Sequence, residues 1–148
     1  MREFDYIIAG SGAAGLTLAF LLMEHEYSEK KVLIIDKDLK ENNDRTWCFW
    51  QKGENMLEQL VHKQWGQVVV KGSQFEKSYQ IAPYSYKMIR GIDFYHFMKE
   101  SISIHPNVTW INEEVTSIED DGTVSTNSES FKGELVFNSI FNYQQLEK

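Results

Sequence analysis

The feature that most constrains the fold of this chain is a glycine-rich turn between two short apolar segments near its start. The segment DYIIA at residues 5–9, apolar after Asp5, leads directly into the sequence GSGAAG at residues 10–15, and an apolar helical stretch follows. A second apolar run, residues 31–35, ends at Asp36. A strand, a glycine turn, a helix and a second strand in this order predict a βαβ unit with parallel strands.

Each glycine of this turn has its own predicted task. Gly10 permits a tight turn, Gly12 lets the backbone approach a ligand closely, and Gly15 lets the helix lie close to the sheet. Unpaired amides and the helix dipole favour a phosphate at the start of the helix. Asp36 follows Gly15 by 21 positions, where an acid accepts hydrogen bonds from a ribose. The pattern predicts a dinucleotide site, and the carboxylate disfavours the 2′-phosphate of NADP.

Composition excludes several classes of function. A chain of 148 residues is long enough for one domain with a core, and its net charge of −7 argues against a nucleic-acid partner. The single cysteine, Cys48, excludes an internal disulfide framework and a cysteine-rich metal site. We expect Cys48 to be a small buried apolar side chain. The histidines show no metal-ligand spacing, so we expect no metal.

The start of the chain runs straight into a strand and shows neither a signal peptide nor a membrane-spanning segment. Together with the low cysteine content, this favours a cytoplasmic protein. Aromatic residues make up 14% of the chain, which leaves room for a peripheral membrane contact.

Beyond Asp36 the chain alternates loops, strands and one further helix. Asp93 is the predicted N-cap of a helix at residues 94–104. Residues 67–70 and 76–81 are predicted strands that form a hairpin, and residues 108–111 are a predicted strand beside the first two. Residues 114–119 and 123–126 are predicted to form a β-meander, and residues 134–137 a last strand. The predicted fold class is α/β, a Rossmann-like parallel sheet with an N-terminal βαβ unit and an antiparallel β-meander.

Several of these segments are similar to those of a known family. The N-terminal unit, the helix after residues 89–93 and the β-meander resemble the FAD-binding domain of glutathione-reductase-like flavoproteins. Within that group, the sequence DRTWCFW at residues 44–50 resembles the segment after the second strand in lycopene cyclases of the carotenoid pathway. Residues 84–94 and 136–139 are also similar to that family. The glycine motif is shared by the broad flavoprotein group, and residues 44–50 narrow the resemblance to lycopene cyclases.

The resemblance implies a cofactor, a reaction and a substrate. The cofactor is FAD, in its reduced form with NAD(P)H as reductant, and the full-length relative closes rings at the ends of lycopene without net redox change. The substrate is an apolar polyene, consistent with peripheral membrane contact. Residues 1–148 correspond to the N-terminal part of an FAD-binding domain, and we expect a truncated chain with a polar tail at 142–148. The ring type and the catalytic residues stay open.

The resemblance also implies roles for individual residues. Arg90 contacts the phosphate or ribose, the backbone at Val115 lies beside the adenine, and Arg45 or Thr46 lies near the flavin. A solvated arginine and a core valine are the alternatives for Arg90 and Val115. The aromatic side chains of residues 47–50 line a polyene cavity or belong to the core. The predicted cofactor-binding residues are Gly10, Gly12, Ala13, Ala14, Gly15, Asp36, Lys37, Arg45, Thr46, Arg90 and Val115.

Two other functions remain open at this stage. An FAD-dependent oxidoreductase or hydroxylase of the same fold shares every feature except residues 44–50. A non-catalytic dinucleotide-binding fragment is the third possibility, because the residues that the family uses for cyclisation lie beyond Lys148.

Overall fold

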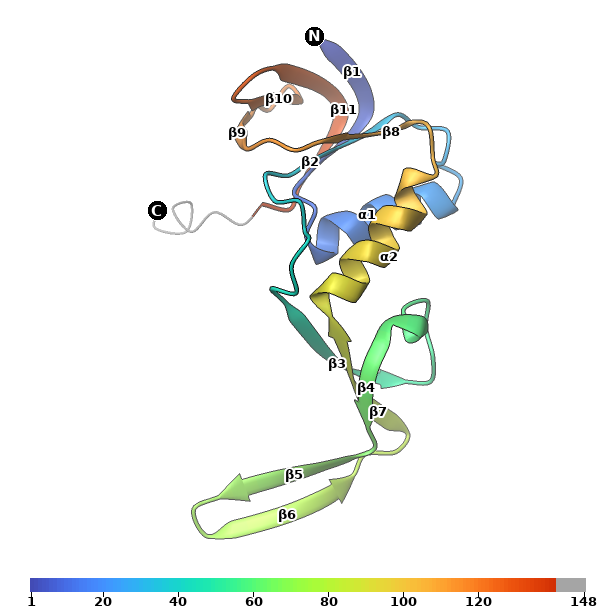
Figure 1. The fold of residues 1–148 in the computed structure, drawn as a ribbon, viewed down its shortest axis with the longest axis vertical. Helices are drawn as coiled ribbons and strands as arrows, with labels where there is room; N and C mark the ends of the chain where they lie inside the picture. The colour runs from blue at the N-terminus through green and yellow to red at the C-terminus, as the bar shows by residue number, and fades with distance from the viewer. Residues whose placement is uncertain (141–148) are drawn as a thin grey trace. The chain divides into compact units, whose positions relative to one another are not determined.

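The computed structural model describes residues 1–140, and the predicted polar tail at residues 142–148 lies outside them. The chain forms two compact units (Figure 1). The first unit is built from residues 1–40 and from residue 97 onward, and the second from residues 41–96. Helix α2 (Gly91–Ser103) has residues in both.

The first unit is built on a six-stranded sheet with the order β8-β2-β1-β11-β10-β9. Its strands are β1 (Arg2–Ala9), β2 (Val32–Ile35), β8 (Val108–Ile111), β9 (Val115–Ile118), β10 (Thr123–Thr126) and β11 (Ser130–Asn138). β8, β2, β1 and β11 are parallel, and β10 is antiparallel to both of its neighbours. Both the parallel sheet and the β-meander are as predicted, so the α/β fold class is confirmed.

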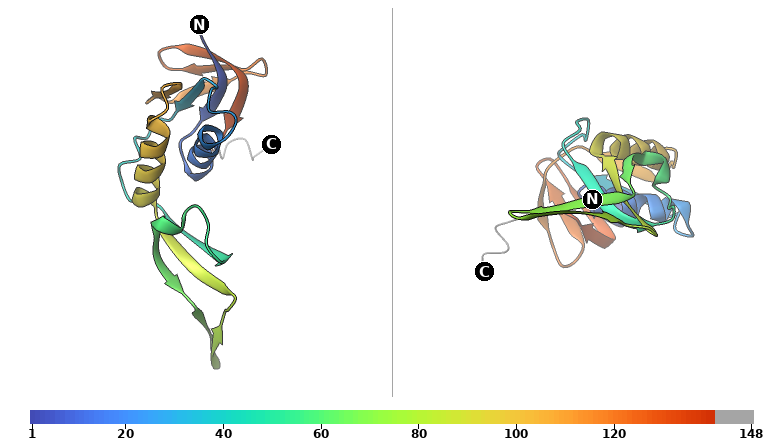
Figure 2. Two further views of the ribbon diagram at one scale, coloured as in Figure 1. Left: turned by 90° about the vertical axis from the view of Figure 1, so that its right-hand side faces the viewer. Right: turned by 90° about the horizontal axis from the view of Figure 1, so that it is seen from below.

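Apolar side chains on both faces explain the central position of β1 and β2 in this sheet. On one face, Ile7 and Leu33 join a buried cluster with Val124 and Phe131 from the meander strands. On the other face, helix α1 (Ala13–Glu24) lies against β1 (Figure 2). A strand covered on both faces has to be apolar throughout, and all four residues of β2 are buried.

The second unit contains two antiparallel sheets. One has the strand order β3-β7-β4 and the other pairs β5 with β6. The elements are β3 (Thr46–Lys52), the short 3₁₀ helix η1 (Glu58–Leu60), β4 (Val61–Trp65), β5 (Gln67–Gly72), β6 (Phe75–Gln80) and β7 (Tyr84–Arg90). The β5–β6 hairpin was predicted, whereas β3, β4 and β7 were not recognised as strands.

Successive side chains of β3 point to opposite faces of the sheet, and this determines which residues of the 44–50 segment are exposed. Trp47 is half-buried and its ring lies 5.1 Å from that of Phe94 and 5.7 Å from that of Tyr95. Cys48 and Trp50 point to the opposite face and are exposed. The expected burial of Cys48 was therefore wrong, because neighbouring residues of a strand face opposite sides of the sheet.

The start of α2 also differs from the prediction. The helix begins at Gly91, whose amide donates to the Arg45 carbonyl oxygen at 2.7 Å. Asp93 lies in the first turn, and its carboxylate accepts two hydrogen bonds from Arg90, from Nε at 2.6 Å and from Nη2 at 2.9 Å. Asp93 is therefore not the N-cap, because the helix begins at Gly91, three residues before the predicted start at residue 94.

The turn of the meander carries a carboxylate with a strongly lowered pKa. Lys132 Nζ lies 2.8 Å from Asp121 Oδ2, and the Thr123 amide donates to Oδ1 at 2.9 Å. Chiefly through Lys132, these bonds lower the pKa of Asp121 from 3.8 to about 2. A lowered pKa means that the stabilising effect is present above 3.8 and is lost as the pH falls through about 2.

Replacing Lys132 with methionine should therefore raise the pKa of Asp121 toward 3.8, its ordinary value. NMR titration of the Asp121 carboxyl carbon measures this directly. Lys71→Met, which removes the partner of Glu76 instead, is the matched control and should leave Asp121 unchanged. An Asp121 pKa that stays near 2 in Lys132→Met would contradict the assignment.

Candidate functional site

The carboxyl end of β1 and the start of α1 form a closely fitted glycine turn. Gly10 has a φ of 100°, which side chains rarely allow. A β-carbon at Gly15 would overlap the carbonyl oxygen of Gly10 and lie 3.1 Å from Cγ2 of Ile8. The predicted tasks of both glycines, a tight turn and close helix packing, agree with this geometry.

Gly12 differs from the other two glycines because its α-carbon faces open space. A β-carbon built there would meet no atom of residues 1–140 within 4 Å. Gly12 is the N-cap of α1, and no side chain in the described part of the chain caps the helix. The first amides of the helix, which include Ala13 and Ala14, therefore face this space without intrahelical acceptors. Such an arrangement suits a phosphate group at close range.

Asp36 is held against the glycine turn by Ser11. The Ser11 amide donates to Asp36 Oδ2 at 2.6 Å, and the Ser11 hydroxyl donates to the same oxygen at 2.9 Å. The Asp38 amide donates to Oδ1 at 2.9 Å. The carboxylate thus has a fixed orientation at the end of β2, and its remaining lone pairs are available to an incoming hydroxyl.

Lys40, in the loop after Asp36, places a positively charged group beside this carboxylate. Lys40 Nζ lies 3.5 Å from Asp36 Oδ2 and 3.3 Å from Asp38 Oδ2, and only 14% of the Lys40 side chain is exposed. The hydrogen bond from the Lys40 amide, together with the ammonium groups of Lys40 and Lys99, lowers the pKa of Asp38. The lowered pKa keeps Asp38 charged at neutral pH.

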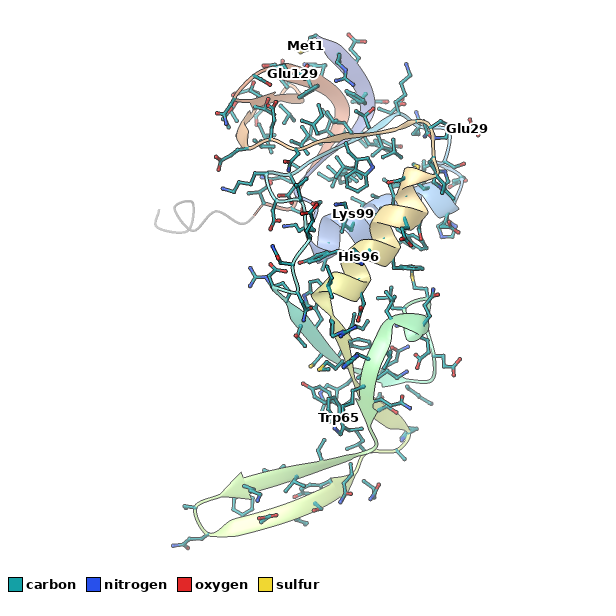
Figure 3. The ribbon with its side chains drawn as sticks, viewed as in Figure 1. Met1, Glu29, Trp65, His96, Lys99 and Glu129 are labelled. Atoms are coloured by element: carbon teal, nitrogen blue, oxygen red, sulfur yellow. The ribbon has the colours of Figure 1, made fainter. Side chains whose placement is uncertain are left out.

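A cavity of about 140 Å³ opens beside Asp36. Residues that line it include Ser11, Asp36, Leu39, Lys99, Trp110 and Asn112. Lys99, labelled in Figure 3, reaches from α2 to the loop and donates to the Leu39 carbonyl oxygen at 2.6 Å. Trp110 Nε1 is buried and has no hydrogen-bond partner in the described part of the chain. An unpaired buried donor beside a cavity fits a ligand with an acceptor atom, such as a purine or a ribose.

Lys37 and Val115 lie at the margin of this site. The Lys37 ammonium pairs with Glu114 at 2.7 Å, which raises the lysine pKa, and both side chains are more than half exposed. Val115 begins β9 and packs against the buried cluster of the sheet. The prediction that the Val115 backbone lies beside the adenine stays a prediction.

The other predicted site residues come together in the second unit. Thr46 lies opposite Arg90 in the register of β3 and β7. Arg45 is exposed, with Nε 3.6 Å from Asp44 Oδ2, whereas Arg90 is held by its two hydrogen bonds to Asp93. The prediction that these three residues contact the cofactor stays a prediction.

Sequence reasoning missed four residues that build the site. Ser11 and Lys40 hold Asp36, Trp110 lines the cavity, and Ser139 donates through Oγ to the Gly10 carbonyl oxygen at 2.9 Å. Ser11 stands inside the glycine motif and could have been found there. The other three have no local signal, because only the sheet and the loops bring them to the glycine turn.

Two further observations concern the described residues as a whole. Within residues 1–140, no group of three metal-ligating side chains is close enough to hold a metal ion. No helix in this range is long and apolar enough to cross a membrane.

Solved structures with a similar fold include two flavin-dependent enzymes and an oxygenase. PqsL, a probable FAD-dependent monooxygenase from Pseudomonas aeruginosa, superposes with a TM-score of 0.73 at 14% identity, over 91% of this chain and 42% of its own. The flavin-dependent brominase Bmp2 gives 0.67 at 18% identity, over 98% and 40%. An oxygenase of 2-methyl-3-hydroxypyridine-5-carboxylic acid gives 0.69 at 15% identity, over 92% and 38%. The chain spans about two fifths of the length of these proteins and has the fold of part of an FAD-binding domain.

Sequence comparison identifies a narrower group of proteins than the fold comparison does. No curated protein matches this chain significantly. The model of a family described as lycopene cyclase protein matches residues 5–140, which include the glycine turn, Asp36 and the residue 44–50 segment. The chain therefore belongs to the lycopene cyclase protein family.

Proposed function

We propose that this chain forms the FAD-binding part of a lycopene cyclase-like flavoenzyme of carotenoid biosynthesis. Family membership supports the reaction, and the open space at Gly12 supports the cofactor. Among the described residues, no atom lies within 4 Å of a β-carbon built at Gly12, although Gly10 and Gly15 are closely packed. An unfilled site of this kind favours an anionic ligand over a purely structural turn.

Each part of the cofactor has residues of this chain to hold it. The pyrophosphate lies at the amides of residues 12–15, and the ribose hydroxyls donate to Asp36, which Ser11 orients. The adenine occupies the cavity beside Trp110, with the Val115 backbone nearby. Lys37 adds backbone contacts, and Arg45, Thr46 and Arg90 contact the flavin or phosphate region.

The proposed reaction is an isomerisation of an apolar polyene. A proton adds to a terminal double bond, a carbon–carbon bond closes the ring, and a proton leaves, so no net redox change occurs. When bound in its reduced form, with NAD(P)H as reductant, the flavin supplies negative charge near the developing positive charge. The protein acts in the cytoplasm with a peripheral membrane contact, through which the polyene enters.

The activity is tested in a host that accumulates lycopene. A full-length protein that contains this chain should convert lycopene to cyclic carotenoid, measured by liquid chromatography of pigment extracts. Unchanged lycopene in cells whose protein holds stoichiometric flavin would refute the cyclase function and leave FAD binding intact.

Gly12→Ala separates cofactor binding from folding. The added β-carbon meets no protein atom within 4 Å but occupies space beside the pyrophosphate. We expect FAD affinity to fall at least about tenfold, with a loss of folding stability below about 1 kcal/mol from the weaker N-cap. Flavin fluorescence titration and thermal unfolding measure the two quantities. Gly66→Ala, also free of contacts within 4 Å, is the control. Unchanged FAD affinity in Gly12→Ala would argue against a pyrophosphate there.

The fold likeness supports a second candidate, an FAD-dependent oxidoreductase or hydroxylase. That function predicts NAD(P)H consumption coupled to oxygen uptake with a small aromatic substrate. A third candidate, a non-catalytic dinucleotide-binding fragment, needs only the open glycine turn and the fixed Asp36 carboxylate. A purified chain without a flavin absorption band and without turnover would favour this third function.

A further inference from the structure

The three-stranded sheet of the second unit has two chemically different faces. One face carries Trp47, Lys87 and Ile89; Lys87 and Ile89 are buried, and Trp47 packs on Phe94 and Tyr95. The opposite face carries Cys48, Trp50 and Lys52 from β3, Tyr84, Tyr86 and Met88 from β7, and Lys63 and Trp65 from β4. These residues are exposed or half-buried. No carboxylate occurs among these eight residues, although the whole chain has a net charge of −7.

An unbroken row of aromatic rings crosses this exposed face. Trp50, Tyr86 and Trp65 lie directly opposite one another on β3, β7 and β4. The ring centroids of Trp50 and Tyr86 are 5.0 Å apart, and those of Tyr86 and Trp65 are 5.8 Å apart. Trp50 is 55% exposed. We refer to these three residues as the aromatic row; Trp65 is labelled in Figure 3.

The row already attracts a cation. Lys63 Nζ lies 5.4 Å from the centroid of the Trp65 ring, within the range of a cation–π interaction. The Cys48 thiol beside the Tyr86 hydroxyl raises the pKa of that phenol, so Tyr86 stays neutral at physiological pH. The row thus offers electron-rich ring faces without any negatively charged group that would require hydration.

We propose that the aromatic row is a binding surface for the conjugated chain of an apolar polyene. Planar π-systems pack well against aromatic faces. A row three strands wide suits an elongated molecule better than a compact one. The ring faces also attract positive charge, which develops on the polyene in the cyclisation proposed above, so this inference rests on the proposed function. The lysines of the face repel a second copy of the same surface.

The test measures polyene binding by induced circular dichroism, because an achiral polyene gives a signal in its visible band only when it is held asymmetrically. The full-length protein is titrated with lycopene in nonionic detergent, and flavin fluorescence follows FAD in the same samples. Trp50→Ala and Trp65→Ala should each weaken lycopene binding about tenfold and leave FAD affinity unchanged. Trp50→Phe, which keeps a ring, should restore most of the affinity.

Phe75→Ala is the matched control, because Phe75 is 57% exposed, close to Trp50, but lies on the β5–β6 hairpin outside the row. It should bind lycopene within about twofold of the unmodified protein. If Trp50→Ala and Trp65→Ala bind as tightly as Phe75→Ala, the aromatic row is refuted while the cyclase function stands. If the unmodified protein gives no induced signal while FAD binds, both proposals fail.

Discussion

Replacing Gly15 with alanine is expected to destabilise the first unit by about 3 kcal/mol, because the new β-carbon would overlap the Gly10 carbonyl oxygen. This backbone oxygen belongs to the turn out of β1 and accepts a hydrogen bond from Ser139 Oγ at 2.9 Å. The melting temperature should fall by roughly 6–12 °C for a chain of this size. Thermal unfolding followed by circular dichroism measures the change.

Whether Gly15→Ala stabilises or destabilises the protein distinguishes the effect of helix propensity from that of the clash. Helix propensity alone predicts that alanine at a helical position stabilises by about 1 kcal/mol relative to glycine. Gly66→Ala, whose β-carbon meets no atom within 4 Å, shows the effect of the substitution without a clash. A melting temperature that rises in Gly15→Ala would mean that α1 is not seated on the glycine turn as described.

The second large effect is expected at Glu58 in the second unit. Lys87 is only 2% exposed, and its ammonium contacts Glu58 Oε2 at 2.6 Å and the Gly53 carbonyl oxygen at 2.8 Å. Glu58→Ala removes the carboxylate that pairs with this buried charge. Because an uncompensated buried charge is costly, we expect a loss of about 3 kcal/mol in the free energy of unfolding. Urea unfolding followed by tryptophan fluorescence measures it.

An exposed ion pair of the same unit provides the control for Glu58. Lys71 and Glu76 are 2.8 Å apart, but their side chains are 67% and 59% exposed. Glu76→Ala should cost less than about 1 kcal/mol, since water screens and replaces such a pair. Lys87→Met, which removes the buried charge itself, should cost less than Glu58→Ala. Equal losses in Glu58→Ala and Glu76→Ala would contradict the burial of Lys87.

Local patterns predicted much of the first unit. The apolar runs at β1 and β2 and the turn residues of the meander were sufficient to place these strands. The strands β3 and β7 were missed because aromatic and charged side chains occur on both faces and obscure a simple apolar alternation. Buried Lys87 and exposed Trp50 are the clearest examples.

The candidate site was likewise predictable from the sequence only in part. Glycine spacing and Asp36 were sufficient to predict a dinucleotide site, since each residue has a stereochemical task that few others can perform. The orientation of Asp36 by Ser11 and the unpaired Trp110 donor needed the folded structure. They depend on contacts between segments that are 25 or more residues apart in the chain.

The sequence by itself determined the order of strands and helix in the N-terminal βαβ unit, the family and the location of the glycine turn. These follow from backbone stereochemistry and short-range periodicity, which are local properties. Only the tertiary structure decided that Gly12, unlike Gly10 and Gly15, faces open space, that Asp36 is fixed by Ser11, and that Trp50 joins an exposed aromatic row. Burial and side-chain partners depend on strand register and on which face a neighbour covers, and neither is encoded in any single segment.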